Sequence, residues 1–154
     1  PQLMQSICLN IGLLPGDNPE ISVDVIEDSC RFTCTNLPYG DVVRVLKAGP
    51  PTRGQKRLRY NLTDKSQRDV YSLILKVLAD NPPLVEIDME ELLQRILKNL
   101  DSIKIAMQKV KDALKNWQKM LADYGPMYQV FEWKDDVIHI QDNLFLFYLR
   151  WSSI

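Results

Sequence analysis

Histidine is almost absent from this chain, since His139 is the only one among 154 residues. The sequence also contains no GxSxG, HExxH, P-loop or GxGxxG pattern, so the usual marks of a nucleophile, a zinc site or a phosphate-binding loop are missing. Neighbouring acids such as Asp135 and Asp136 point apart on a turn, so they form no ready acid–base pair. We therefore expect a protein that is not an enzyme, with no catalytic residue, no metal site and no cofactor.

Cysteine is scarce and odd in number, with Cys8, Cys30 and Cys34. The spacing of Cys30 and Cys34 fits neither a zinc knuckle nor a redox CxxC pair. On one strand their Cα atoms would lie roughly 13 Å apart, at about 3.3 Å per residue. That separation is too large for a disulfide. Reduced thiols predict an intracellular protein of the cytoplasm or nucleus.

Long apolar runs are missing as well, and the longest one, Leu144–Leu149, is far too short to cross a membrane. The net charge of −1 predicts no overall attraction to nucleic acid or to a lipid surface. The chain starts at Pro1 and stops directly after a strand-like segment. We expect residues 1–154 to form a single α+β domain that is a fragment of a larger protein.

One long apolar series is what the chain does contain. Between residues 87 and 124, apolar side chains recur at gaps of four and three residues, which is the coiled-coil period of one helix face. Such a helix would be roughly 57 Å long at about 1.5 Å per residue. A domain of this size is only about 40 Å across. The sequence therefore predicts one long heptad-patterned helix over 87–124 that protrudes from the domain.

A protruding apolar stripe needs a partner, either another protein or a second copy. We expect the contact to be made by Ile103, Met107, Val110, Leu114, Trp117 and Leu121. Trp117 is the natural anchor, because buried tryptophans dominate many interfaces. Two alternatives stay open: the helix lies in the domain's own core, or it bends near Lys98–Asn99 or Asp101–Ser102. The first expectation for function is thus a non-catalytic protein–protein interaction or scaffold module of an intracellular assembly.

The segments before this helix predict strands and then short helices. Alternating apolar residues predict an N-terminal antiparallel strand meander over 3–13, 21–25 and 32–34. Short helices are expected over 42–48 and 65–80. Gly49 and the Asn81-Pro82 pair end them, because neither glycine nor proline continues a helix well.

The segments after the long helix predict a second group of strands. Gly125-Pro126 stops the helix, and 128–133 and 137–140 then predict a β-hairpin around a Lys134-Asp135-Asp136 turn. The segment 144–151 is apolar on both faces, which is typical of a covered central strand. A C-terminal β-hairpin or three-stranded unit therefore completes the predicted α+β fold.

Charge is strongly segregated despite the small total. Residues 1–43 carry six acids and one base, whereas residues 44–76 carry nine bases and two acids. Eight of these bases fall in a Gly- and Pro-containing loop over 44–68, where mobile cations can contact phosphates and Tyr60 can stack on a base. The candidate nucleic-acid or anion contacts are Arg53, Lys56, Arg57 and Arg59. The alternative function is therefore a nucleic-acid-binding subunit.

The basic loop also allows plainer interpretations. It can be solvated, neutralised by the acids of residues 1–43, or directed at an acidic protein or a phospholipid. A second set of bases lies on the predicted long helix, where Lys104, Lys109, Lys111, Lys115 and Lys119 face a single acid, Asp112. We interpret these lysines as a solvated helix face.

Overall fold

The computed structural model describes residues 2–13, 20–101 and 104–152, and the side chain of Met127 is not described. The helices are α1 (Gln2–Ile11), α2 (Val23–Cys34), α3 (Gly40–Ala48), α4 (Val70–Leu78), α5 (Met89–Asn99), α6 (Met107–Tyr124) and α7 (Asn143–Trp151), with a 3₁₀ turn η1 (Pro126–Tyr128). The strands are β1 (Tyr60–Asn61), β2 (Gln67–Arg68), β3 (Glu86–Asp88), β4 (Phe131–Lys134) and β5 (Val137–Ile140).

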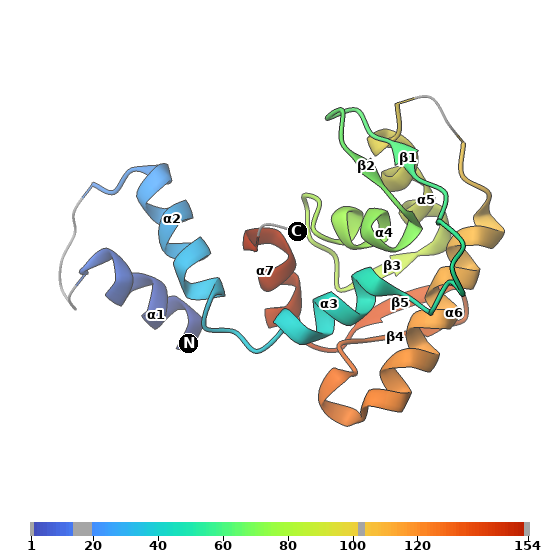
Figure 1. The fold of residues 1–154 in the computed structure, drawn as a ribbon. Helices are drawn as coiled ribbons and strands as arrows, with labels where there is room; N and C mark the ends of the chain where they lie inside the picture. Colours follow the sequence, from blue (N-terminus) through green and yellow to red (C-terminus); the bar gives the residue numbers. More distant parts are fainter. Residues whose placement is uncertain (1, 14–19, 102–103, 153–154) are drawn as a thin grey trace.

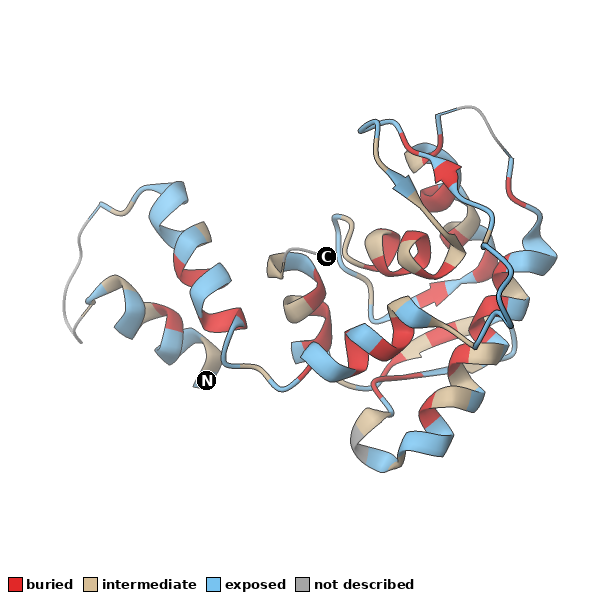
Figure 2. Ribbon diagram, viewed as in Figure 1, coloured by how far each residue is buried: buried red, intermediate tan, exposed pale blue. Residues whose placement is uncertain are grey.

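The described chain has two parts, an N-terminal hairpin formed by α1 and α2, and a body formed by residues 39–152 (Figure 1). In the N-terminal hairpin, α1 packs on α2, and α2 packs in turn against α7 of the body. Buried residues gather in the body, whereas much of the surface of α1 and α2 is exposed (Figure 2). The main hydrophobic core therefore belongs to the body.

The order of elements in the body defines its topology. α4, β3, α5, α6, β4 and β5 follow one another, and β3 pairs antiparallel with β5, so the strand order is β3-β5-β4. In this unit the consecutive helices α5 and α6 are followed by the β4–β5 hairpin, and β5 lies between β3 and β4. The strands β1 and β2 form a separate two-stranded ribbon.

Helix α4 lies at the centre of the body and contacts α3, α5, α6 and α7. Its side chains Leu73, Ile74, Leu75, Val77 and Leu78 are all 0–1% exposed. A helix that is apolar on nearly all sides is stable only when neighbours cover it all round. The Asp69 side chain begins α4 by accepting the N–H of Ser72 at 2.9 Å. No helix within the described ranges is both long enough and apolar enough to cross a membrane.

The N-terminal strand meander that the sequence predicts is wrong, because both segments are helices. Leu3, Ile7 and Ile11 are spaced by four residues, so they share one face of a helix. The Ser22 side chain accepts the N–H of Val25 at 3.5 Å and marks the beginning of α2. A serine N-cap thus prevails over the alternation of apolar residues that follows it.

The continuous helix predicted over 87–124 is also wrong, because α5 ends at Asn99, α6 begins at Met107, and α6, the longest helix described, has 18 residues. Leu62, which follows β1, pairs with Leu100 in an antiparallel bridge that two further backbone hydrogen bonds flank. These bonds occupy backbone groups that would otherwise continue the helix. One of the two bend sites that the sequence allows is where α5 ends.

The predicted strand over 144–151 is a further error, because residues 143–151 form α7. The carboxylate of Asp142 accepts the N–H of Leu144 at 3.0 Å and so caps the helix. The buried residues of α7 are Phe145, Leu146 and Leu149, at helical spacing. The hairpin of β4 and β5 does lie where the sequence predicts it, and so do α3 and α4.

Candidate anion-binding site

The apolar stripe offered for partner contact lies largely inside the body. Val110, Leu114 and Trp117 are 0% exposed and Leu121 is 2% exposed. Met107, the first residue of α6, is 46% exposed, and Ile103 lies outside the described residues. In this fold the four buried members of the stripe contact the protein's own core and offer no surface to a partner.

Trp117 joins α6 to three other elements. Its Nε1 donates a hydrogen bond of 2.8 Å to the carbonyl oxygen of Leu46 in α3. Its ring lies edge-on to Phe131 of β4, with centroids 5.7 Å apart, and tilted against Tyr71 of α4, with centroids 6.1 Å apart. The end of α3 is therefore held against α6 and α4, and the basic loop starts from that fixed point.

Gly49 turns the chain from α3 into the basic loop. Its φ of 56° lies in the left-handed region, and a Cβ atom at this position would lie 2.7 Å from a ring carbon of Tyr71. The hydroxyl of Tyr71 accepts a hydrogen bond of 3.0 Å from Nδ2 of Asn116 in α6. Only glycine therefore allows the chain to turn against a tyrosine that is itself held by α6.

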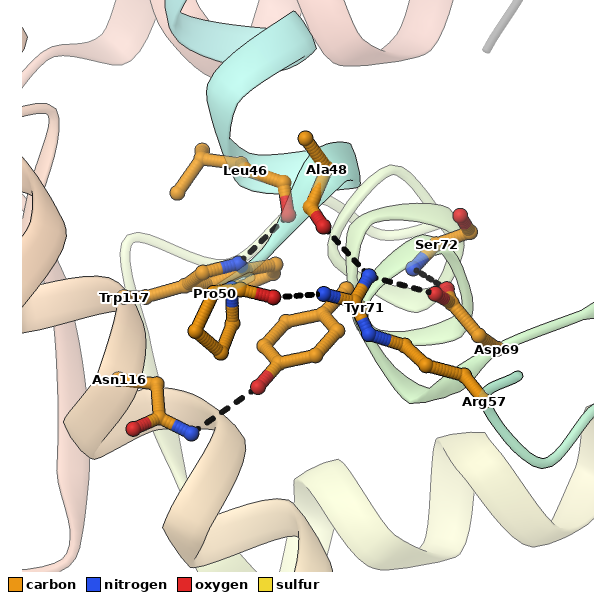
Figure 3. A network of polar contacts seen from close by, with 9 residues as sticks. All are labelled: Leu46, Ala48, Pro50, Arg57, Asp69, Tyr71, Ser72, Asn116 and Trp117. Carbon is orange, nitrogen blue, oxygen red and sulfur yellow. Dashed lines mark hydrogen bonds and ion pairs between the residues drawn. The ribbon is translucent and has the colours of Figure 1, made fainter. Parts of the chain in front are cut away.

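Arg57 fastens the basic loop to the body (Figure 3). Its guanidinium donates to the carbonyl oxygens of Ala48 and Pro50 and forms an ion pair of 3.2 Å with Asp69. The same guanidinium lies over the ring of Tyr71, 4.7 Å from its centroid. Four partners thus engage Arg57 within the chain, so this candidate contact residue has a structural role.

A pocket of about 690 Å³ lies between the basic loop, β2 and the beginning of α4. It is lined by Thr52, Gln55, Lys56, Arg57, Arg59, Gln67, Arg68, Asp69 and Ser72. Lys56 and Arg59 are exposed, and neither forms an ion pair within the described ranges. Asp69 is the only acid among the lining residues, and it already caps α4 and pairs with Arg57. The pocket is therefore positively charged.

One further cation, Lys47, lies beside Arg68 of the pocket lining. The half-buried Lys47 lies close enough to Arg68 for the two charges to repel, so burial first and Arg68 second lower the pKa of Lys47. The sequence pointed to Lys47 and Arg68 only as members of the basic run, because their proximity depends on how α3 and β2 are placed. Arg53, the fourth candidate, is exposed and does not line the pocket.

The ion pairs formed by the described acids of residues 20–43 lie within their own helices. Arg31 pairs with Glu27 and Asp28 in α2, and Arg44 pairs with Asp41 in α3. Of the ion pairs between described residues, none joins residues 20–43 to the basic loop. α2 and the basic loop lie at opposite ends of the molecule (Figure 1). The charge segregation in the sequence is thus preserved in the fold.

Helix α6 brings further cations to the side of the basic loop, since Asn116 and Trp117 contact the residues around it. Lys109, Lys115 and Lys119 are exposed on this helix. Lys111 instead forms an ion pair of 2.6 Å with Asp136 in the turn between β4 and β5. Lys115 Nζ lies 6.0 Å from the centroid of the Trp133 ring in β4, so these lysines add exposed positive charge to α6 outside the pocket itself.

For the part of the chain that is described, no group of three His, Cys, Asp or Glu side chains is placed to hold a metal ion. No protein-family model matches the chain, and no curated protein or solved structure matches it. What the fold and the pocket define is a body packed around the central helix α4, with a basic pocket between the basic loop, β2 and the beginning of α4.

Proposed function

We propose that this chain is a non-catalytic nucleic-acid-binding module whose basic pocket binds backbone phosphates. The observation that supports it best is the convergence of the exposed Lys56 and Arg59 on one pocket in which the only lining acid is already engaged. Each phosphate contact by a lysine or arginine releases counterions, which contributes affinity at low salt. Gln55 and Gln67 add neutral donors that suit phosphate oxygens.

The topology of the body supports the same proposal by analogy. In helix-turn-helix proteins the second helix enters the major groove of DNA, and α6, the second of two consecutive helices before a β-hairpin, carries the exposed Lys109, Lys115 and Lys119. A fold alone does not determine a function, because the same topology hosts unrelated activities. The pocket therefore carries the proposal, and α6 extends it to a surface that a duplex can contact at more than one phosphate.

The test is the affinity for fluorescein-labelled duplex DNA and single-stranded RNA, measured by anisotropy at about 50 and about 200 mM salt. We expect Lys56→Glu with Arg59→Glu to weaken binding at least tenfold and to lower the slope of log K against log[salt] by about two. Arg57→Glu is unsuitable, because Arg57 holds the loop in place.

The matched control is Lys98→Glu with Arg150→Glu, since both side chains are exposed and neither lines the pocket. This variant carries the same charge change and should retain most of the affinity. An equal loss in both variants would show that only net charge matters and would contradict a pocket. Absence of binding to either nucleic acid at the lower salt would overturn the proposal.

A protein contact is the second candidate function, as the sequence first suggests. The buried residues of α6 offer no surface for it, but another observation favours it: apolar side chains are exposed on the N-terminal hairpin.

A further inference from the structure

The N-terminal hairpin leaves large apolar side chains in contact with solvent. Of twelve large apolar side chains that are exposed in the described structure, six belong to α1 and α2. They are Met4 (65%), Leu9 (71%), Val23 (69%), Val25 (45%), Ile26 (40%) and Phe32 (59%). Figure 2 shows that both helices are mostly exposed. Val25 and Phe32, which are seven positions apart, lie on the same side of α2, away from the buried Cys30 and Cys34, and we call this side the outer face of the hairpin.

The inner side of the hairpin explains why the outer face is uncovered. Ile7 of α1 is buried against α2, and its carbonyl oxygen accepts a hydrogen bond of 3.0 Å from the hydroxyl of Ser29. Cys30 and Cys34 are buried on the other side, and the thiol of Cys34 contacts the carbonyl oxygen of Tyr148 in α7 at 3.5 Å. A pair of helices that leans on one further helix has a single covered side. The outer face therefore lacks a partner within the described chain.

The charges around the outer face have one predominant sign. α1 contains no charged residue, and α2 contains Asp24, Glu27 and Asp28 against the single base Arg31. That arginine is bonded to Glu27 and Asp28, so it presents no free cation to a partner. Asp24 is exposed near the apolar side chains and forms no ion pair among the described residues. A ligand of this surface must combine apolar side chains with positive charge.

We propose that the outer face of the hairpin docks an amphipathic helix of another protein, with Leu- or Phe-type side chains on one side and flanking Lys or Arg. Helix-in-groove recognition places apolar anchors at positions i, i+3 or i+4, and i+7, and charge complementarity fixes the orientation and speeds association. Three packed helices would also cover the apolar side chains that two helices leave exposed.

A second copy of this chain is a poorer occupant. Two hairpins placed face to face would bring their acidic α2 surfaces together, and like charges across an interface are costly. Helix α6 of a second copy cannot be the docked helix either, since its apolar residues Val110, Leu114 and Trp117 are buried. An anionic lipid surface would repel the same acids. The complementary helix therefore comes from a different protein.

The experiment is selection of a phage-displayed library of helical peptides on the immobilised full chain. The library fixes a helical scaffold, varies the apolar positions among Leu, Phe and Ala, and varies the flanking positions between Lys and Glu. We expect enrichment of peptides with a Leu or Phe stripe and flanking Lys. Enrichment of Glu-flanked peptides, or enrichment of none, would overturn the proposal.

The location is tested with Val25→Ser and Phe32→Ser combined, since these two exposed residues are seven positions apart on α2. This variant should bind the selected peptide at least tenfold more weakly and keep the circular dichroism and the melting temperature of the parent chain. Leu97→Ser on α5 is the matched control, because Leu97 is 47% exposed and far from α2 in sequence. Equal weakening in the control would place the peptide elsewhere and contradict the docking surface.

Light scattering after size exclusion distinguishes the remaining occupant. We expect a monomer at all concentrations, in agreement with a face reserved for another protein. A concentration-dependent dimer that the double serine variant abolishes would show that a second copy covers the face and would overturn the choice of partner.

Discussion

The central helix of the body and the second helix of the N-terminal hairpin form an instructive pair. α4 and α2 are of similar length, and each has a side-chain cap at its N-terminus. α4 is covered by four helices, and five of its apolar side chains are at most 1% exposed. α2 is covered by α1 and α7, and Val23, Val25 and Phe32 remain in solvent. Burial in this molecule thus depends on the number of neighbours that the topology supplies.

The same contrast separates the two proposed activities. The body holds its basic pocket rigidly, because Arg57, Gly49 and Tyr71 tie the loop to the core. The N-terminal hairpin presents an apolar surface that has one supporting contact, to α7. A rigid site suits phosphates, which have fixed geometry, whereas an apolar helical face suits another helix.

The difference in burial between the two parts is tested most directly by removing one aromatic side chain from each. Trp117→Ala should destabilise the protein by about 3–5 kcal/mol, because it leaves a cavity and removes the hydrogen bond to Leu46. Phe32→Ala should change the free energy of unfolding by no more than about 0.5 kcal/mol, as for other exposed positions. Urea denaturation measures both. A large loss at Phe32 would show that the chain itself covers the outer face.

A glycine substitution gives the next largest effect and tests the rigidity of the pocket. Gly49→Ala should cost about 2 kcal/mol, because φ is positive and the new Cβ would strike the ring of Tyr71. Gly54→Ala in the same loop is the control, since its φ is also positive but nothing lies within 4 Å of its Cβ position. It should cost only about 1 kcal/mol. Equal costs in thermal denaturation would mean that the Tyr71 contact contributes nothing to the position of the loop.

The parts of the fold that the sequence predicts correctly are those with local signals. α3 ends at Gly49, α4 ends shortly before Asn81-Pro82, and the turn between β4 and β5 lies at Asp135–Asp136. In each case a residue with a special backbone preference marks the boundary. Local signals do not tell a strand from a helix when apolar residues fit both periods, as Leu3, Ile7 and Ile11 do.

The break in the long helix depends on a contact that no local pattern contains. Leu62 pairs with Leu100 across 38 residues, and the helix ends because the backbone is engaged there. The heptad series remains valid on each side of the break, since both α5 and α6 direct their apolar residues to the core. A continuous period therefore indicates a continuous apolar surface, which two helices can share.

Only part of the candidate site could be predicted from the sequence. Lys56 and Arg59 follow from composition alone, because a run of bases in a loop tends to be exposed. The structural role of Arg57 could not be predicted, since two of its acceptors are backbone carbonyls whose positions depend on the turn at Gly49. The proximity of the two cations Lys47 and Arg68 likewise could not be predicted, because it depends on how the fold packs.

The smallest expected effect concerns the reactivity of the Cys34 thiol, on the buried side of α2, and not the free energy of unfolding. Burial, and then the nearby Cys30, raise the pKa of Cys34 to about 11, above the ordinary value of a free thiol, so at about pH 8 its thiolate is roughly a hundredfold rarer than that of an unperturbed thiol. Iodoacetamide should therefore modify Cys34 at least a hundredfold more slowly in the folded chain than in guanidinium. Because the pKa lies above the working range, the rate should rise about tenfold for each pH unit from 8 to 10.

Mass spectrometry of a Cys8→Ser variant follows this reaction without interference from the more exposed thiol of α1. Slow alkylation of Cys34 would mean that the inner side of α2 is packed as tightly as the body, although its outer side is open. Alkylation at the rate of the unfolded chain would mean that α2 separates readily from α7. The N-terminal hairpin would then be an independent arm, and the difference from the body would extend from exposure to stability.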